Sequence, residues 1–169
     1  MNAGMKTIIW QQFGASIDML ENAIKACPDE VWGNRIDFWE FWYLAYHTIF
    51  WLDLYMTDVA EEEFRPPKPY TLTELDPAGA LPDRIYTKVE LLSYLDLGRQ
   101  KARAKVAGLT EEDVARKCSS RPSLTVVELL LYVMRHMQHH AAQLNLLLRQ
   151  RIDSAPKWVS ITKIKLSDS

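Results

Sequence analysis

Residues 125–151, TVVELLLYVMRHMQHHAAQLNLLLRQR, contain a long amphipathic pattern. Apolar side chains recur in it at helical spacing, which predicts an α-helix from about Ser123 or Thr125 to Arg151. Glu128 stands three residues after Thr125, and this spacing is typical of a capping box at a helix N-terminus. We therefore expect one face of this helix to enter a helical core.

Other parts of the chain have the same kind of periodicity. The additional long helices are expected at about residues 6–26, 38–59 and 88–107. Asp37 and Glu40 would form the capping box of the helix at 38–59, and Thr87 and Glu90 that of the helix at 88–107. A short acidic helical turn is expected at 111–117, and an extended arm that packs on the helices at 157–166.

The connections between these helices differ in length. Residues 61–86 form a long, proline-rich link, whereas the other links are short. Short links make antiparallel neighbours, and a long link permits a parallel crossover. The sequence therefore predicts an all-α protein with a single domain over residues 1–169. The predicted architecture is a four-helix bundle in up-down-down-up order, with the crossover between its second and third helices.

Composition excludes several classes of function. The chain has 169 residues, of which 48% are hydrophobic and 25% charged, and its net charge of −2 argues against a nucleic-acid binder. The longest uncharged hydrophobic run, Phe41–Leu52, is too short for a membrane span. Cys27 and Cys118 are too few for a disulfide framework. We interpret them as reduced thiols of a cytoplasmic protein.

Histidines supply the best indication of a functional site. His136, His139 and His140 lie within the run RHMQHH, and the fourth histidine, His47, lies in the aromatic helix at 38–59. His136 and His140 are four residues apart, so they project from one face of a helix. Neutral imidazole nitrogens suit zinc, nickel, copper or iron. We predict one divalent transition ion, preferably zinc or nickel, bound by His136, His140 and His47.

A purely structural role is the alternative for these histidines. His136 and His140 fall inside the apolar stripe of their helix, where a single histidine is commonly a hydrogen-bonded core residue. Two on successive turns are harder to explain by packing. Met137 replaces the general-base glutamate that a zinc-protease helix needs, which excludes a peptidase. We interpret His139 as a supporting, substrate-contacting or rim residue, and Gln143 as a hydrogen-bond partner for a ligand's outer nitrogen.

The chain resembles the DinB/YfiT-like superfamily of metal-dependent proteins. The resemblance rests on His47, late in a tryptophan-rich helix, and on the string HMQHHAAQL at residues 136–144. It extends from the first to the last long helix, and it implies a bundle in up-down-down-up order. It also implies that His47, His136 and His140 are the metal ligands.

The resemblance also suggests a reaction. Characterised members of the family include transferases and isomerases that use bacillithiol, mycothiol or glutathione. We therefore expect a metal-dependent transferase acting on a low-molecular-weight thiol and a small electrophile. A metal-dependent hydrolase and a non-catalytic ligand-binding bundle are the alternatives. The family's frequent Arg-Gly pair is Ala141-Ala142 here, so the substrate contact of that arginine is in doubt.

Two expectations concern surfaces. Apolar side chains cover more than one face of the helix at 38–59, which predicts a homodimer because large exposed apolar patches are rare on monomers. The alternative is that the proline-rich link and the C-terminal arm with Trp158 cover the second face. Alternating cations near the end of the helix at 88–107 are interpreted as a solvated face; they are Arg99, Lys101, Arg103 and Lys105.

Overall fold

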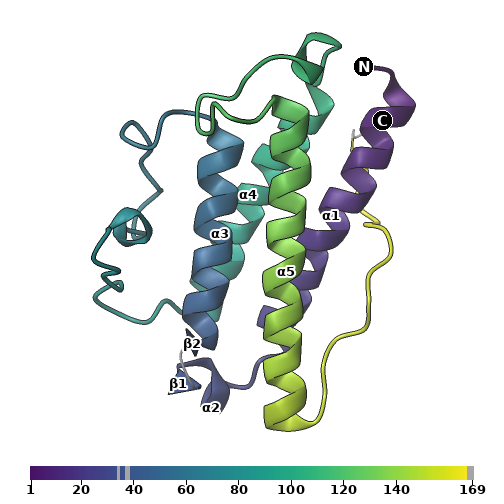
Figure 1. The fold of residues 1–169 in the computed structure, drawn as a ribbon. Helices are drawn as coiled ribbons and strands as arrows, with labels where there is room; N and C mark the ends of the chain where they lie inside the picture. Colours follow the sequence, from purple (N-terminus) through teal and green to yellow (C-terminus); the bar gives the residue numbers. More distant parts are fainter. Residues whose placement is uncertain (34, 37–38, 167–169) are drawn as a thin grey trace.

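The computed structural model describes residues 1–33, 35–36 and 39–166, and it is predominantly helical (Figure 1). The predicted all-α class is confirmed. The helices are α1 (Ala3–Ala26), α2 (Asp29–Trp32), α3 (Phe41–Thr57), α4 (Lys88–Ala107) and α5 (Val126–Ile152). Short 3-10 turns, η1 and η2, lie at Thr73–Leu75 and Glu112–Val114. Strands β1 (Arg35–Ile36) and β2 (Trp39–Glu40) form a small antiparallel pair.

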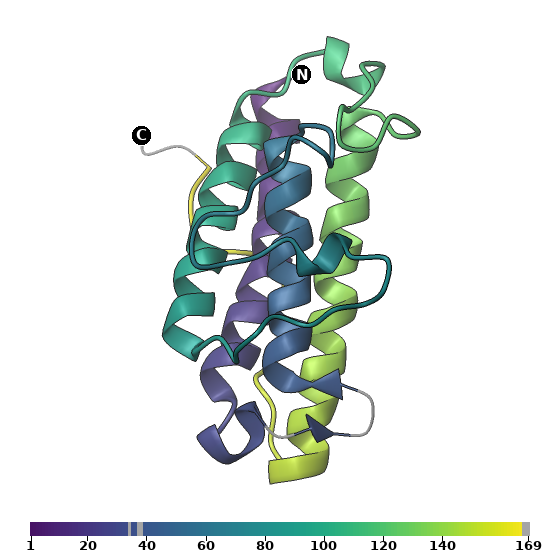
Figure 2. The ribbon, with the colours of Figure 1, turned by 90° about the vertical axis from the view of Figure 1, so that its left-hand side faces the viewer.

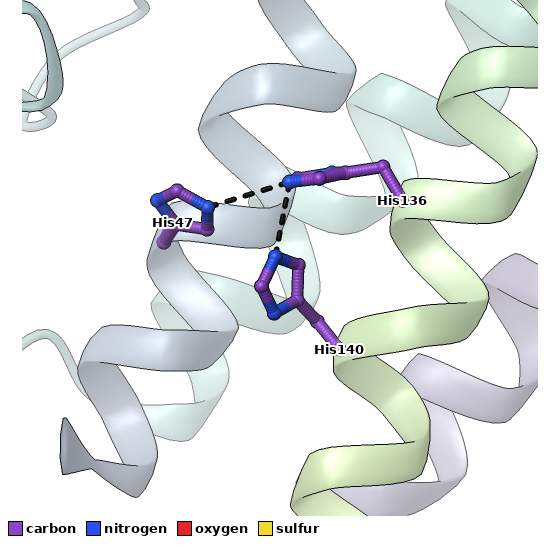
Figure 3. A group of neighbouring side chains, drawn as sticks. All are labelled: His47, His136 and His140. Carbon is purple, nitrogen blue, oxygen red and sulfur yellow. Dashed lines mark hydrogen bonds between the residues drawn. The ribbon is translucent and has the colours of Figure 1, made fainter.

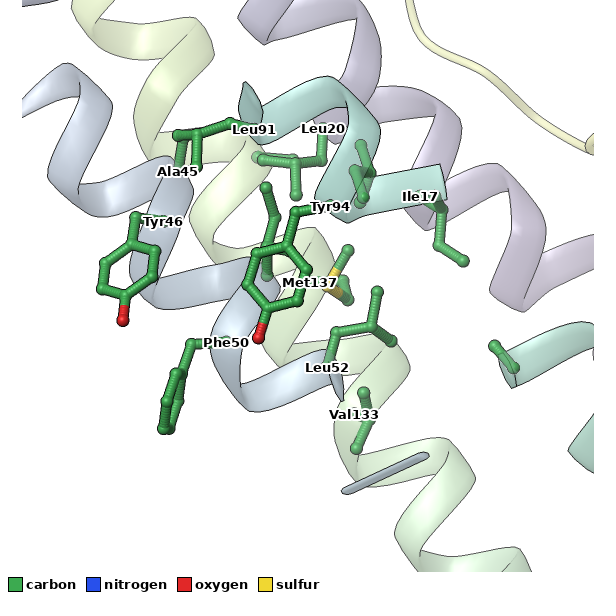
Figure 4. Close-up of a cluster of buried hydrophobic side chains, with 14 of the residues drawn as sticks. Ile17, Leu20, Ala45, Tyr46, Phe50, Leu52, Leu91, Tyr94, Val133 and Met137 are labelled. Carbon is green, nitrogen blue, oxygen red and sulfur yellow. The ribbon is translucent and has the colours of Figure 1, made fainter. Parts of the chain in front are cut away.

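The long helices pack side by side (Figure 1). Helix α1 packs on α4 and α5, and α3 packs on the same two helices. The apolar core lies between them (Figure 4), with labelled side chains that include Ile17, Leu20, Leu52, Leu91, Val133 and Met137. In the part of the chain that the structure describes, no helix is long and apolar enough to cross a membrane.

Helices α4 and α5 begin where the sequence predicts. The side chains of Thr87 and Thr125 each accept a hydrogen bond from the backbone N–H three residues later. The carboxylates of Glu90 and Glu128 accept hydrogen bonds from the backbone N–H groups of these threonines. Both predicted capping boxes are confirmed, which explains why the start of each helix could be predicted from local sequence.

The start of α3 differs from the prediction. The helix was expected from Phe38, but it begins at Phe41 because Trp39 and Glu40 pair with β1. Glu40 occupies the N-cap position with extended backbone and forms no side-chain capping hydrogen bond; its carboxylate accepts a hydrogen bond from the Trp42 indole instead. Asp37, the predicted N-cap, and Phe38 lie outside the described residues.

The long link between α3 and α4 crosses the outer face of α3 (Figure 2). The Tyr46 hydroxyl donates to the Thr71 carbonyl at 2.8 Å, and Phe64 packs edge-on against Phe50 with ring centroids 5.4 Å apart. The crossover therefore covers α3 at Tyr46 and Phe50, whereas Tyr43 and Trp51 of the same helix are half-buried. These contacts agree with the alternative in which the proline-rich link, and not a second chain, packs on the apolar side chains of α3. The homodimer stays a prediction.

The segment after α5 packs along α1 without helix or strand, in keeping with the predicted arm (Figure 1). The Trp10 indole donates to the Ile164 carbonyl at 2.7 Å, and the Thr162 backbone N–H donates to the Gln11 carbonyl at 3.1 Å. Trp158 is 68% exposed, so this side chain is not what covers α3.

The cations near the end of α4 do not form a solvated face. Arg99 is buried and donates to the carboxylates of Asp18 and Glu21 on α1. Lys101 forms an ion pair with the fully buried Asp53 of α3. The interpretation as a solvated face is wrong for these two residues, because α4 packs against both α1 and α3 and presents a cation to each.

Candidate metal centre

Three imidazole side chains from two helices converge on one point (Figure 3). His47 comes from α3, and His136 and His140 come from α5. The Nε2 atom of His136 lies 3.3 Å from Nε2 of His47 and 3.0 Å from Nε2 of His140. One ring nitrogen from each histidine lies within 4.8 Å of the other two. The structure thus brings together the three residues that the sequence singled out.

The helical geometry of α5 explains this arrangement. His136 and His140 are one turn apart, so their rings lie above one another on the same face. Met137, between them in sequence, points into the core and is fully buried. Helix α3 packs on α5, and His47 therefore meets the histidine pair from across the contact between the helices.

The separations of the His136 Nε2 atom from the other two Nε2 atoms fit a single tetrahedral ion. Zinc–nitrogen bonds are about 2.0–2.1 Å long, so two nitrogens on one tetrahedral zinc ion lie roughly 3.3 Å apart. The observed separations of 3.0 and 3.3 Å are close to this value. Three neutral imidazoles are also a donor set that divalent transition metals accept. The site could therefore hold a metal ion with a position left open for another ligand.

Hydrogen bonds hold the outer nitrogens of two rings. His47 Nδ1 lies 2.6 Å from Oε2 of Glu74, and His140 Nδ1 lies 2.6 Å from Oε1 of Gln143. These oxygens accept hydrogen bonds, so Nδ1 carries a hydrogen in both rings and Nε2 is the atom near the other histidines. Gln143 was expected in this role, and its hydrogen bond confirms the expectation. Such partners fix the orientation and raise the basicity of a ligating histidine.

Glu74 is the site residue that sequence reasoning missed. It lies in η1, within the crossover, and its side chain is only 3% exposed. Burial, with the negative charge and hydrogen bond of Glu74, raises the pKa of Tyr43, which stands one turn before His47. Nothing in the sequence around Glu74 distinguishes it from the other acidic residues of the link, because its role depends on the path of the crossover.

Replacing Glu74 by alanine should weaken metal binding by about 10–100-fold, the usual loss when a partner of a ligating histidine is removed. The physical reason is that His47 loses both its fixed orientation and the acceptor for its Nδ1 hydrogen. Competition with a chromophoric chelator measures the affinity. Glu61→Ala is the matched control, since Glu61 is an exposed residue of the same link. Equal affinities for the two variants would show that Glu74 has no such role.

The histidines on α5 are held in the neutral form. Burial, and to a lesser extent the neighbouring imidazoles, lower the pKa of His136 from 6.5 to about 3. Burial also lowers the pKa of His140 to about 4, although the hydrogen bond with Gln143 acts in the opposite direction. Both rings are therefore neutral at pH 7, which is the form that binds a metal.

These shifts predict how the stability of the metal-free protein depends on pH. Below about pH 6.5 the histidines of the unfolded chain take up protons, while His136 and His140 of the folded chain stay neutral down to about pH 4. The free energy of unfolding should therefore fall between pH 6.5 and 5, by roughly 1–2 kcal/mol for each histidine at pH 5. Urea unfolding with a chelator present measures it. The double variant His136→Gln, His140→Gln should lack this slope; an equal slope in both proteins would contradict the prediction.

The site is next to an open hollow on α5. This hollow has a volume of about 540 Å³ and is lined by Tyr132, Arg135, His136, Gln138, His139 and Ala142. His136 thus belongs both to the histidine group and to the wall of the hollow. His139 is exposed and stands at the edge of the hollow, outside the group of three ligands. Of the roles considered for His139, its position fits that of a rim residue.

Comparison with known proteins identifies one family whose model matches most of the chain. The model of the DinB superfamily matches residues 12–144, a range that includes all of α3 and α4 and the three converging histidines. No curated protein and no solved structure matches the chain. The family match covers well over half of the 169 residues. The chain belongs to the DinB superfamily.

Proposed function

We propose that this protein is a metal-dependent transferase that joins a low-molecular-weight thiol to a small electrophile. His47, His136 and His140 would hold the divalent ion, preferably zinc or nickel. The observation that carries the proposal is the convergence of three Nε2 atoms 3.0 and 3.3 Å apart. The hydrogen bonds of Glu74 and Gln143 to the outer nitrogens support it further.

The residues around the site suit a thiol substrate. A divalent ion at this position would supply a Lewis acid that lowers the pKa of a coordinated thiol. The thiolate is the reactive form, so the protein need not provide a separate general base. The residues one turn either side of His136 are Tyr132 and His140, which offer no carboxylate, and the Glu74 carboxylate is buried with its Oε2 atom held by His47. In the transfer a carbon–sulfur bond forms, the leaving group departs with its electron pair, and the thiol proton passes to solvent.

The proposal includes the helix order and the cellular location. The crossover from the end of α3 to the start of α4 is longer than the links from α1 to α3 and from α4 to α5, which supports an up-down-down-up bundle (Figure 2). Cys27 and Cys118 are free, buried thiols, which supports a cytoplasmic protein. The partner is a small molecule, and neither nucleic acid nor membrane is part of the proposal.

We retain the homodimer as a proposal with its own test. The crossover covers part of the outer face of α3, which leaves less of that face for contact with a second chain. Light scattering at high protein concentration should give the mass of two chains. The mass of one chain at every concentration would overturn the dimer and leave the transferase proposal intact.

An activity screen of the metal-loaded protein tests the reaction. Glutathione, bacillithiol and mycothiol would each be paired with monochlorobimane, and ester substrates would be tested without thiol. Thiol-dependent turnover that His136→Ala abolishes and His139→Ala preserves is the expected result. Ester cleavage without thiol would identify a hydrolase instead. If neither assay shows activity with metal present, a non-catalytic ligand-binding bundle would be favoured.

A further inference from the structure

Aromatic side chains continue from the histidine site along the contact between α3 and α5. On α3, Trp51 lies one turn after His47 and Tyr55 one turn after Trp51, with ring centroids 6.3 and 5.4 Å apart. On α5, Tyr132 lies one turn before His136, and its ring meets Tyr55 edge-on with centroids 5.8 Å apart. Trp51, Tyr55 and Tyr132 therefore form an aromatic wall that leads away from the histidines.

Arg121 stands at the end of this aromatic wall. Its Nη1 group donates to the hydroxyls of Tyr55 and Tyr132 at 3.2 and 3.3 Å. Its guanidinium carbon lies 4.6 Å from the centroid of the Tyr132 ring, a cation–π contact. Among the residues that the structure describes, Arg121 has no carboxylate partner, and its Nε and Nη2 groups donate to none of them. Arg121 is therefore a half-buried cation that two neutral hydroxyl groups orient. Its Nε and Nη2 groups remain able to donate hydrogen bonds to a ligand.

The distance from Arg121 to the histidines suits a small bifunctional molecule. An α-helix rises 1.5 Å per residue, so Tyr132 and His136 are about 6 Å apart along α5. The tyrosine side chain adds to this separation, which places the guanidinium on the order of 10 Å from His136 Nε2. Tyr132 and His136 also line the same hollow. A thiol whose carboxylate is several bonds from its sulfur has the length to reach from one end to the other.

We propose that Arg121 binds a carboxylate of the thiol substrate, so that the site selects carboxylated thiols over uncharged ones. This inference rests on the proposed function, because it places the sulfur of the thiol at the histidine site. A guanidinium offers a planar pair of donors that matches a carboxylate, and the unused donors of Arg121 meet this requirement. The proposed contact also distinguishes among the candidate thiols, because glutathione and bacillithiol carry carboxylates and mycothiol carries none.

Arg135 provides a matched control for this inference. It lines the hollow that Tyr132 and His136 also line, and it forms no ion pair with any residue in the described part of the chain. Its side chain is exposed and forms no hydrogen bond with the residues that the structure describes. A merely electrostatic effect of positive charge near the hollow would involve both arginines, whereas a specific carboxylate contact would involve Arg121 alone.

Isothermal titration calorimetry of the zinc-loaded protein with glutathione and with glutathione diethyl ester tests the proposal. The ester keeps the thiol and lacks the carboxylate charges. The wild type should bind glutathione about 10–100-fold more tightly than the ester, because only glutathione can form a hydrogen bond between two charged groups with Arg121. Arg121→Gln should remove this preference, Arg121→Lys should retain part of it, and Arg135→Gln should leave it unchanged. Zinc content and melting temperature, measured after each titration, verify that every variant remains folded and zinc-bound. If Arg121→Gln fails to fold, Arg121→Lys takes its place.

The outcomes separate this inference from the proposed function. Equal affinities for glutathione and its ester, a preference that survives in Arg121→Gln, or binding of neither compound would each overturn the inference. Arg121-dependent binding of glutathione without turnover of any electrophile would support the inference and overturn the transferase. Turnover with equal KM values for glutathione and its ester would support the transferase and overturn the inference.

Discussion

Replacing His136 by alanine is expected to abolish tight binding of a divalent ion and to lower the stoichiometry from one ion per chain to none. The Nε2 atom of His136 is the common neighbour of the other two ligands, 3.3 Å from that of His47 and 3.0 Å from that of His140. Without it, only two imidazoles from different helices remain. The loss of affinity should exceed the roughly 10–100-fold that removal of a supporting residue costs.

Elemental analysis of protein expressed without a polyhistidine tag measures this effect. His139→Ala is the control, because His139 lies next to the ligands in sequence but outside the group of three. A second measurement is thermal unfolding with and without the ion. At an ion concentration 100 times the Kd, the wild type should gain about 2.7 kcal/mol of stability, and His136→Ala almost none. A His136→Ala protein that still binds one ion per chain would show that His136 is not a metal ligand.

The features that could be predicted from the sequence are those that depend on nearby residues. The starts of α4 and α5 follow from Thr87 and Thr125 with a glutamate three positions later. The histidine pair on α5 follows from helical spacing, since residues one turn apart share a face. Gln143, one turn beyond His139, was found in the same way. The prediction of His47 as a ligand needed two further arguments. One was that its apolar helix had to pack on α5, and the other was the resemblance to a family.

What could not be predicted depends on contacts between distant segments. Glu74 meets His47 only because the crossover passes over α3 and brings η1 to the site. Arg99 and Lys101 have the sequence pattern of a solvated face, but α4 is packed on two sides and their charges pair with carboxylates of α1 and α3. The β1–β2 pairing likewise displaced the start of α3 to Phe41, against the preference of the local sequence for an earlier cap.

Replacing Asp53 by alanine is expected to lower the free energy of unfolding by about 1–3 kcal/mol, the cost typical of a buried polar group left without its hydrogen-bond partner. The Asp53 carboxylate is fully buried on α3. It accepts a hydrogen bond from the Tyr94 hydroxyl at 3.0 Å and pairs with the ammonium group of Lys101. Alanine would leave the buried Tyr94 hydroxyl without an acceptor and Lys101 without its carboxylate partner, and would open a space between α3 and α4.

Urea unfolding of the chelator-treated protein measures this loss without a contribution from bound metal. Asp18→Ala is the comparison, because Asp18 also pairs with an arginine of α4 but is 19% exposed and can be replaced in part by water. It should cost about 1 kcal/mol. The double variant Asp53→Leu, Lys101→Met should recover much of the stability, since well-packed apolar side chains often replace a buried ion pair at little net cost. A loss below about 1 kcal/mol for Asp53→Ala, or no recovery in the double variant, would show that packing and not the ion pair holds α3 to α4.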